Sequence, residues 1–117
     1  MSAKSCSDTS FYASYKNVII IVAQGLWILI HYTRGSCVAF TAKRLLENAE
    51  CDKPLPVLLT MAKEILNKLV EQKMLTIDDT RSIKRFIICK DSPLWARIKE
   101  AGGPEDVFNY LIEVVKP

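Results

Sequence analysis

The segment VLLTMAKEILNKLVEQK holds hydrogen-bonding side chains at helical spacing, on the side opposite its apolar residues. These side chains are Thr60, Lys63 and Asn67, with Lys68 on their flank. A lysine donates to guanine and an asparagine pairs with adenine through two hydrogen bonds, so the set could read base edges. Any solvated helix can show the same face, however, and the neighbouring Glu64 and Glu71 repel phosphate. The residues alone leave both interpretations open.

A second basic set surrounds the turn DDTRSIK, where long cationic side chains can reach phosphates. Its members are Arg81, Lys84 and Arg85, joined by Lys43 and Arg44 at the start of an upstream helix. Asp78 and Asp79 suit a turn, and without a base or a metal partner in view they make a poor catalytic pair. Ordinary solubilising charge is the alternative explanation for the cations.

No residue pattern in the chain predicts an enzyme or a metal site. Cys6, Cys37, Cys51 and Cys89 form no CxxC pair, and His31 is the single histidine. Zinc and iron–sulfur sites typically show closely paired ligands. The chain also has no Gly-rich phosphate loop, no HExxH and no GxSxG. We therefore expect no catalytic residue, no metal, no cofactor, and cysteines buried as small hydrophobic residues in a reducing, cytoplasmic compartment.

Length and composition are those of one globular domain. The chain has 117 residues, of which 50 % are hydrophobic and 25 % are charged, enough for a sizeable core. The formal net charge is +3, but residues 102–117 hold three acids against one lysine. The positive excess therefore lies in residues 1–101, where a polyanion would dock.

The segment NVIIIVAQGLWILIHYTRG, residues 17–35, has no charged side chain before Arg34. Its apolar centre, residues 18–30, is shorter than the roughly 20 residues of a membrane span, and no signal-peptide cleavage site follows it. Asn17, Gln24 and His31 recur every seven residues and form one thin polar line on a helix. We predict a core helix over 14–33, capped by Gly35, with a membrane anchor as the alternative.

The next elements follow from apolar spacing and capping residues. A short strand is expected at 37–40, and Thr41 is a suitable N-cap for a helix over 42–49, with Leu45 and Leu46 inward. A longer amphipathic helix should run from 56 to about 73. Its predicted buried face consists of Leu58, Ala62, Ile65, Leu66 and Leu69.

The character of the chain then changes to β-type runs. Segments 74–78 and 84–89 flank a polar turn and predict a hairpin. Ser92 and Pro93 should begin a short helix that ends by residue 101. A last helix is expected over 105–115, with an apolar side formed by Val107, Phe108, Leu111, Val114 and Val115.

The order of helix, strand, two helices and hairpin resembles the winged-helix family, a winged variant of the helix-turn-helix. The resemblance rests on CVAFTAKRLLENAE as first strand and second helix, MAKEILNKLVEQKMLTI as third helix entering the wing, and DDTRSIKRFIIC as the wing. It departs at Lys73, where the family commonly has a small residue, often glycine. It implies that the third helix lies in the DNA major groove while the wing grips the backbone.

The resemblance also pairs the first strand antiparallel with the last wing strand, which would bring Cys37 near Cys89. In a reducing cytosol two buried thiols are expected there, and a disulfide, as in the cytosol of hyperthermophiles, is the alternative. The first helix would pack under the others. Apolar surface left over would serve a partner or a second copy, especially around Phe11, Tyr12, Tyr15 and Trp27.

We therefore expect a mainly α protein, a winged helix with a small antiparallel β-hairpin wing and two extra C-terminal helices. Residues 1–13 would be a mobile tail, 14–91 the winged-helix domain, and 92–117 a helical extension serving as an interface. The expected function is binding of double-stranded DNA by a homodimer, away from membranes, as a transcription regulator or chromatin-associated factor. A winged helix serving as a protein–protein interaction module in a larger assembly is the alternative.

Overall fold

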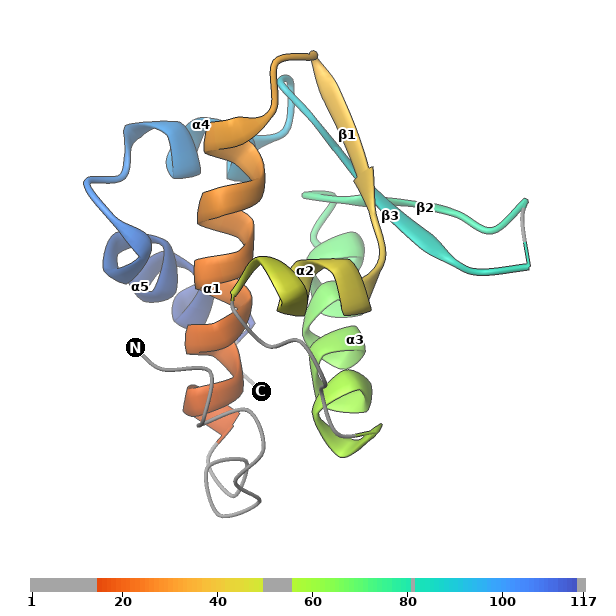
Figure 1. Ribbon diagram of the computed structural model, residues 1–117. Helices are drawn as coiled ribbons and strands as arrows, with labels where there is room; N and C mark the ends of the chain where they lie inside the picture. The colour runs from red at the N-terminus through yellow and green to blue at the C-terminus, as the bar shows by residue number, and fades with distance from the viewer. Residues whose placement is uncertain (1–14, 50–55, 81, 116–117) are drawn as a thin grey trace.

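Helices make up most of the molecule, and a small antiparallel sheet lies at one side (Figure 1). The computed structural model describes residues 15–49, 56–80 and 82–115, so the predicted N-terminal tail lies outside the described residues. The elements in these residues are α1 (Tyr15–Tyr32), β1 (Cys37–Phe40), α2 (Ala42–Asn48), α3 (Pro56–Glu71), β2 (Thr76–Asp78), β3 (Arg85–Cys89), α4 (Pro93–Glu100) and α5 (Pro104–Val114). The predicted mainly helical class with a small antiparallel β-hairpin is confirmed.

Helix α1 is the central element, with α5 on one side and α2 and α3 on the other (Figure 1). Eight of its residues are buried, and Val18, Val22 and Leu26 have no exposed surface. The helix has 18 residues and is apolar enough to cross a membrane, but 44 % of this span is buried inside the protein. The buried hydrophobic residues of α1 belong to the core cluster, as predicted for a core helix.

A glycine in the middle of α1 lets α2 approach closely. A Cβ built on Gly25 would lie 2.5 Å from the Leu45 backbone oxygen and 2.8 Å from Leu45 Cγ. Side chains do not tolerate such short distances, so only glycine permits this approach without a shift of α2. Leu45 and Leu46 are fully buried, and Thr41 Oγ1 accepts a hydrogen bond from the Arg44 amide at 3.1 Å, as expected for an N-cap.

Helix α3 turns the predicted face toward the core. The five residues named from the sequence are its buried residues, and each is 0 % exposed: Leu58, Ala62, Ile65, Leu66 and Leu69. Repeats of three and four residues place these side chains on one side of a helix, where they meet the apolar side chains of α1 and α2. The exposed side of α3 is thereby left for polar residues.

The ends of α1 and α3 differ from expectation. Lys73, just after α3, has φ of 64°. Its amide donates to the Val70 carbonyl at 2.9 Å and the Met74 amide donates to the Leu69 carbonyl at 2.9 Å, the hydrogen-bond pair of a Schellman cap.

The prediction that Gly35 caps α1 is wrong. The helix ends three residues earlier, at Tyr32, and Gly35 has no positive φ; it lies in the turn leading to β1.

The sheet has the strand order β1-β3-β2, with both pairs antiparallel. Cys37 lies opposite Cys89, and a disulfide joins them across Cα atoms 4.0 Å apart. The predicted pairing is therefore confirmed, whereas the expectation of two buried thiols is wrong. Side chains alternate along β3, so Phe86 and Ile88 face the core and Cys89 faces outward, beside the exposed Cys37. Cys6 and Cys51 lie outside the described residues.

The two C-terminal helices share the core with α1. Ser92 Oγ accepts a hydrogen bond from the Leu94 amide at 3.2 Å and donates to the Met74 carbonyl at 2.6 Å, so it caps α4 and ties it to the start of the hairpin. The buried residues of α4 and α5 belong to the same hydrophobic cluster as those of α1: Leu94, Trp95, Ile98, Val107 and Leu111. Because α4 and α5 pack on α1, they do not cover the outward sides of α3 and the hairpin, which lie on the opposite side of the molecule (Figure 1).

Candidate nucleic-acid interface

A groove of about 460 Å³, here called the lysine groove, opens between α3, the start of α2 and the β2–β3 turn. Four of the predicted binding residues line it: Lys43, Lys63, Asn67 and Lys84. The three lysines are exposed and Asn67 is half-buried. Among the residues that the structure describes, no Asp or Glu lines this groove. The fold thus brings together three cations and one amide from three separate elements.

The floor of the lysine groove is apolar. Ala42 and Phe86 are each 2 % exposed, and Leu59 is half-buried beside them. Ile83 also lines the groove and is 65 % exposed, although it is large and apolar. Sequence reasoning missed Ile83, whose signal was its place as the lone apolar residue of the turn DDTRSIK. An apolar floor under a cationic rim suits a ligand with both charge and apolar surface.

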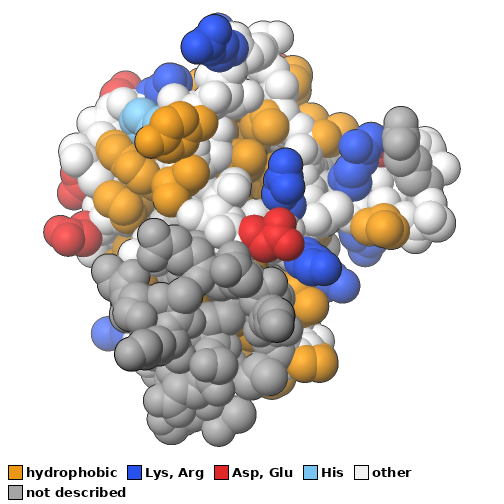
Figure 2. Space-filling model, viewed as in Figure 1, with side chains coloured by type: hydrophobic (Ala, Val, Ile, Leu, Met, Phe, Trp, Pro, Cys, Tyr) orange, Lys and Arg blue, Asp and Glu red, His pale blue; other side chains and the backbone are white. Residues whose placement is uncertain are grey.

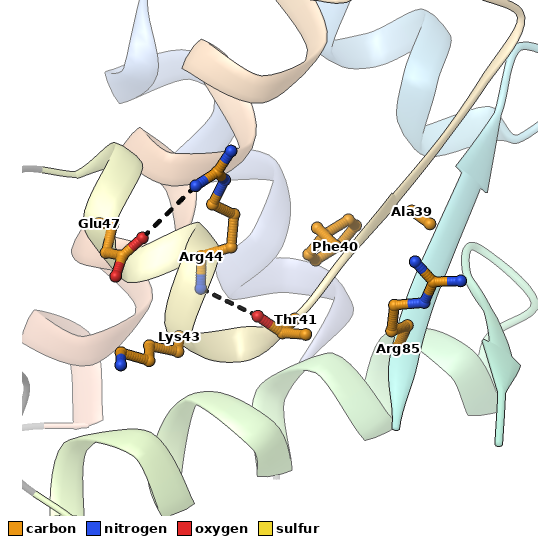
Figure 3. A pocket seen from close by; sticks show the side chains of 7 residues that line it. All are labelled: Ala39, Phe40, Thr41, Lys43, Arg44, Glu47 and Arg85. Carbon is orange, nitrogen blue, oxygen red and sulfur yellow. Dashed lines mark hydrogen bonds and ion pairs between the residues drawn. The ribbon is translucent and has the colours of Figure 1, made fainter. Parts of the chain in front are cut away.

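Arg44 and Arg85 lie elsewhere, at a second hollow of about 320 Å³ that shares Lys43 with the groove (Figure 3). The three cationic side chains point in different directions in Figure 3, so they do not converge on one point. Glu47 also lines this hollow, and its Oε1 lies 3.8 Å from Arg44 Nη1. With a carboxylate among diverging cations, this hollow suits an anion less well than the lysine groove does.

Asp78 organises the hairpin turn, as predicted for a turn residue. Its Oδ1 accepts hydrogen bonds from the Thr80 hydroxyl at 2.6 Å and the Thr80 amide at 3.1 Å. Arg85 Nη2 lies 3.6 Å from Asp78 Oδ2. The hydrogen bonds from Thr80, helped by the Arg85 guanidinium, lower the pKa of the Asp78 carboxyl. Arg85 is therefore engaged within the hairpin.

Two predicted residues of α3 are engaged by the protein itself. The Thr60 hydroxyl donates to the Pro56 carbonyl at 3.0 Å. The Lys68 ammonium lies 5.3 Å from the centre of the Tyr15 ring, on the side of α3 that faces α1. Neither lines the lysine groove, and Arg81 lies outside the described residues.

Charge is unevenly spread over the face shown in Figure 2. Lys and Arg side chains are concentrated on the side that carries α2 and the hairpin, whereas most of the visible Asp and Glu side chains lie toward the opposite edge. The hairpin projects beyond the rest of the molecule (Figure 1), so its cations extend the basic surface outward. Such a surface attracts a polyanion over a distance of several ångströms.

Comparison of this chain with models of known protein families, with curated proteins and with solved structures finds no match.

Proposed function

We propose that this protein is a winged helix that binds double-stranded DNA, as a transcription regulator or a chromatin-associated factor in the cytoplasm. The element order α1-β1-α2-α3-β2-β3 and the sheet order β1-β3-β2 support the resemblance to that family. In this reading β2, β3 and their turn are the wing, and α3 is the helix that approaches the major groove.

The lysine groove carries the proposal. Lys43, Lys63 and Lys84 come from α2, α3 and the wing, yet they line one groove in which no described acidic residue is present. Ammonium groups arranged along a groove neutralise successive phosphates of a nucleic-acid backbone and release counterions from it. Asn67 lies among them and supplies the amide that could pair with a base.

Fluorescence anisotropy of a generic duplex, titrated at low and moderate salt, tests the proposal. The wild type should bind at low salt and lose affinity as salt rises. Replacing Lys63 and Lys84 together with Ala should weaken binding to any sequence and reduce the slope of log K against log salt by about 2, because two phosphate contacts are lost.

A matched control variant removes the same number of positive charges at positions away from the groove. Lys90 and Lys99 are exposed and line no part of the lysine groove, so the K90A/K99A variant should keep the wild-type slope. Absence of binding at low salt would refute DNA binding, and an unchanged slope in K63A/K84A would refute the role of the groove.

An interaction with protein is the second candidate, and one surface of α1 favours it. Ile20, Trp27 and Ile28 lie on one face of the helix, beside the polar line of Gln24 and His31, and all five stay half-buried. We propose that a second copy of the chain covers this face in a homodimer, since apolar side chains left partly uncovered mark interaction sites. Light scattering measures the mass in solution. The wild type should be a dimer, and Ile28→Lys should convert it to a monomer. A monomeric wild type would refute the proposed homodimer.

A further inference from the structure

The outward face of α3 carries an acidic ridge. Thr60, Glu64, Asn67 and Glu71 follow one another at steps of four, three and four residues, so they form one line along the helix, opposite its buried face. Glu64 and Glu71 are exposed, and neither forms an ion pair with another described residue. A duplex centred on this ridge would bring its phosphates toward two uncompensated carboxylates.

The other side chains of the ridge and its flanks offer few contacts to bases. The Thr60 hydroxyl donates its hydrogen bond to the Pro56 carbonyl. The Lys68 ammonium lies over the Tyr15 ring, on the side of α3 that faces α1. Of the α3 residues predicted to read bases, Lys63 and Asn67 are those that line the lysine groove. Lys63 lies on the side of the ridge that faces the wing, and Asn67 borders the groove from within the ridge.

The groove itself suits phosphates better than bases. A lysine is a flexible point charge without the planar fork with which arginine grips guanine, and phosphate contacts carry no sequence information. Direct reading would then rest on Asn67, the one described groove residue with a side-chain amide. One good base contact discriminates by roughly 5- to 150-fold, whereas site-specific proteins prefer their sites by about 10³-fold or more.

We propose that the protein binds duplex DNA largely without regard to its sequence, with the phosphate backbone seated in the lysine groove on the wing side of the acidic ridge. This inference rests on the proposed DNA binding, and it selects the chromatin-associated role over site-specific regulation. The ridge keeps α3 from settling deep into the major groove, because insertion there would bury two carboxylates among phosphates.

Selection from a random-sequence duplex pool, followed by anisotropy on the most and least enriched duplexes of equal length, tests the inference with the full chain. The expected affinities differ by less than about 150-fold, the most that one base contact allows. A larger preference, or a defined enriched motif, would overturn the inference while leaving DNA binding intact. Failure to bind any duplex would instead refute the proposed function.

The E64Q/E71Q variant tests the ridge directly. Removing two negative charges beside the bound backbone should tighten binding several-fold on every duplex, with the ranking of sequences unchanged. The E100Q/E105Q variant removes two exposed carboxylates from α4 and α5 and should bind like the wild type. A changed ranking of sequences in E64Q/E71Q, or no change in affinity, would show that the ridge does not keep DNA away and would overturn the inference.

Discussion

The two ends of the small sheet are held in different ways. At the closed end, where β1 begins and β3 finishes, the disulfide joins Cys37 to Cys89 and the Lys90 amide donates to the Ser36 carbonyl at 2.8 Å. Ser92 Oγ donates to the Met74 carbonyl at 2.6 Å, just before β2. A covalent bond and two hydrogen bonds, one of them partly buried, therefore hold all three strands at this end.

The wing end depends on short-range polar contacts near the surface. Asp78 holds Thr80 through two hydrogen bonds and Arg85 through an ion pair at 3.6 Å. Ile83 extends into solvent, and Lys84 is exposed beside it. Contacts of this kind are individually weak, so this end should open locally at lower free energy than the closed end.

The difference separates the proposed binding surface from the cross-linked part of the sheet. The proposed ligand contacts belong to the wing end, α2 and α3, whereas the cross-link lies at the far end of the strands. Binding elements commonly sit on loops supported by a rigid scaffold, which lets them adjust to a ligand without loss of the fold.

Breaking the closed end should have the largest effect. The disulfide joins residues separated by 52 positions, and the entropy of closing such a loop in the unfolded chain corresponds to about 4 kcal/mol. The Cys37→Ser/Cys89→Ser variant should therefore lose up to about this much free energy of unfolding. Urea unfolding of the oxidised wild type and the variant measures the difference.

Reduction of the wild type provides the control for this prediction. The reduced protein should unfold at the same urea concentration as the double variant, because both lack the cross-link. Hydrogen exchange of the wing amides should change less than that of the β1 and β3 amides near the cross-link. Equal stability of oxidised and reduced protein would remove the contrast between the two ends.

Lys73→Gly should sharpen the contrast by stabilising the chain next to the closed end. Lys73 has φ of 64°, a conformation that costs a residue with a Cβ about 1–2 kcal/mol and costs glycine little. After allowance for the greater freedom of glycine in the unfolded chain, the gain in free energy of unfolding should be roughly 0.5–1 kcal/mol. Lys73→Ala is the matched control, since alanine keeps the Cβ and should give no gain. A Gly variant no more stable than the Ala variant would contradict this account.

The smallest effect is expected at the wing end and depends on pH. Hydrogen bonds from Thr80, with Arg85 nearby, lower the pKa of Asp78 in the folded protein. A carboxyl with a lowered pKa stabilises the fold above its ordinary pKa, and this stabilisation is lost as the pH falls through the lowered value. The Thr80 amide resonance in NMR should therefore titrate below the ordinary Asp range, and Asp78→Asn should abolish that titration. A midpoint within or above the ordinary range would show that the turn does not hold the carboxylate.

The elements and their inward faces could be predicted because they depend on local spacing. The strand at 37–40 follows from a short apolar run, and the five buried residues of α3 follow from apolar spacing of three and four residues. Both patterns are present in the local sequence, whatever the rest of the chain does. Capping by Thr41 and Ser92 was likewise readable, because a cap side chain bonds the backbone two or three residues away. Gly35 failed as a cap because α1 ends at Tyr32 and the backbone of Gly35 does not take the positive φ of a glycine cap.

The composition of the candidate site could be predicted only in part. Lys43, Lys63, Asn67 and Lys84 were all named from the sequence, but helical spacing could not separate Lys63, which enters the groove, from Lys68, which lies over Tyr15. The choice depends on which neighbour each side of α3 meets. Likewise, Arg85 is engaged by Asp78 because the β2–β3 register places them opposite each other.

The sequence by itself determined the mainly helical class, the order of elements and the buried face of α3, because periodicity and capping act over a few residues. Only the tertiary structure decided which cations share a groove, why Gly25 must be small, and that the exposed Cys37 is bonded to Cys89. Each of these depends on a contact between residues far apart in the chain. Such contacts exist only once the elements have packed around α1 and the strands have taken their register.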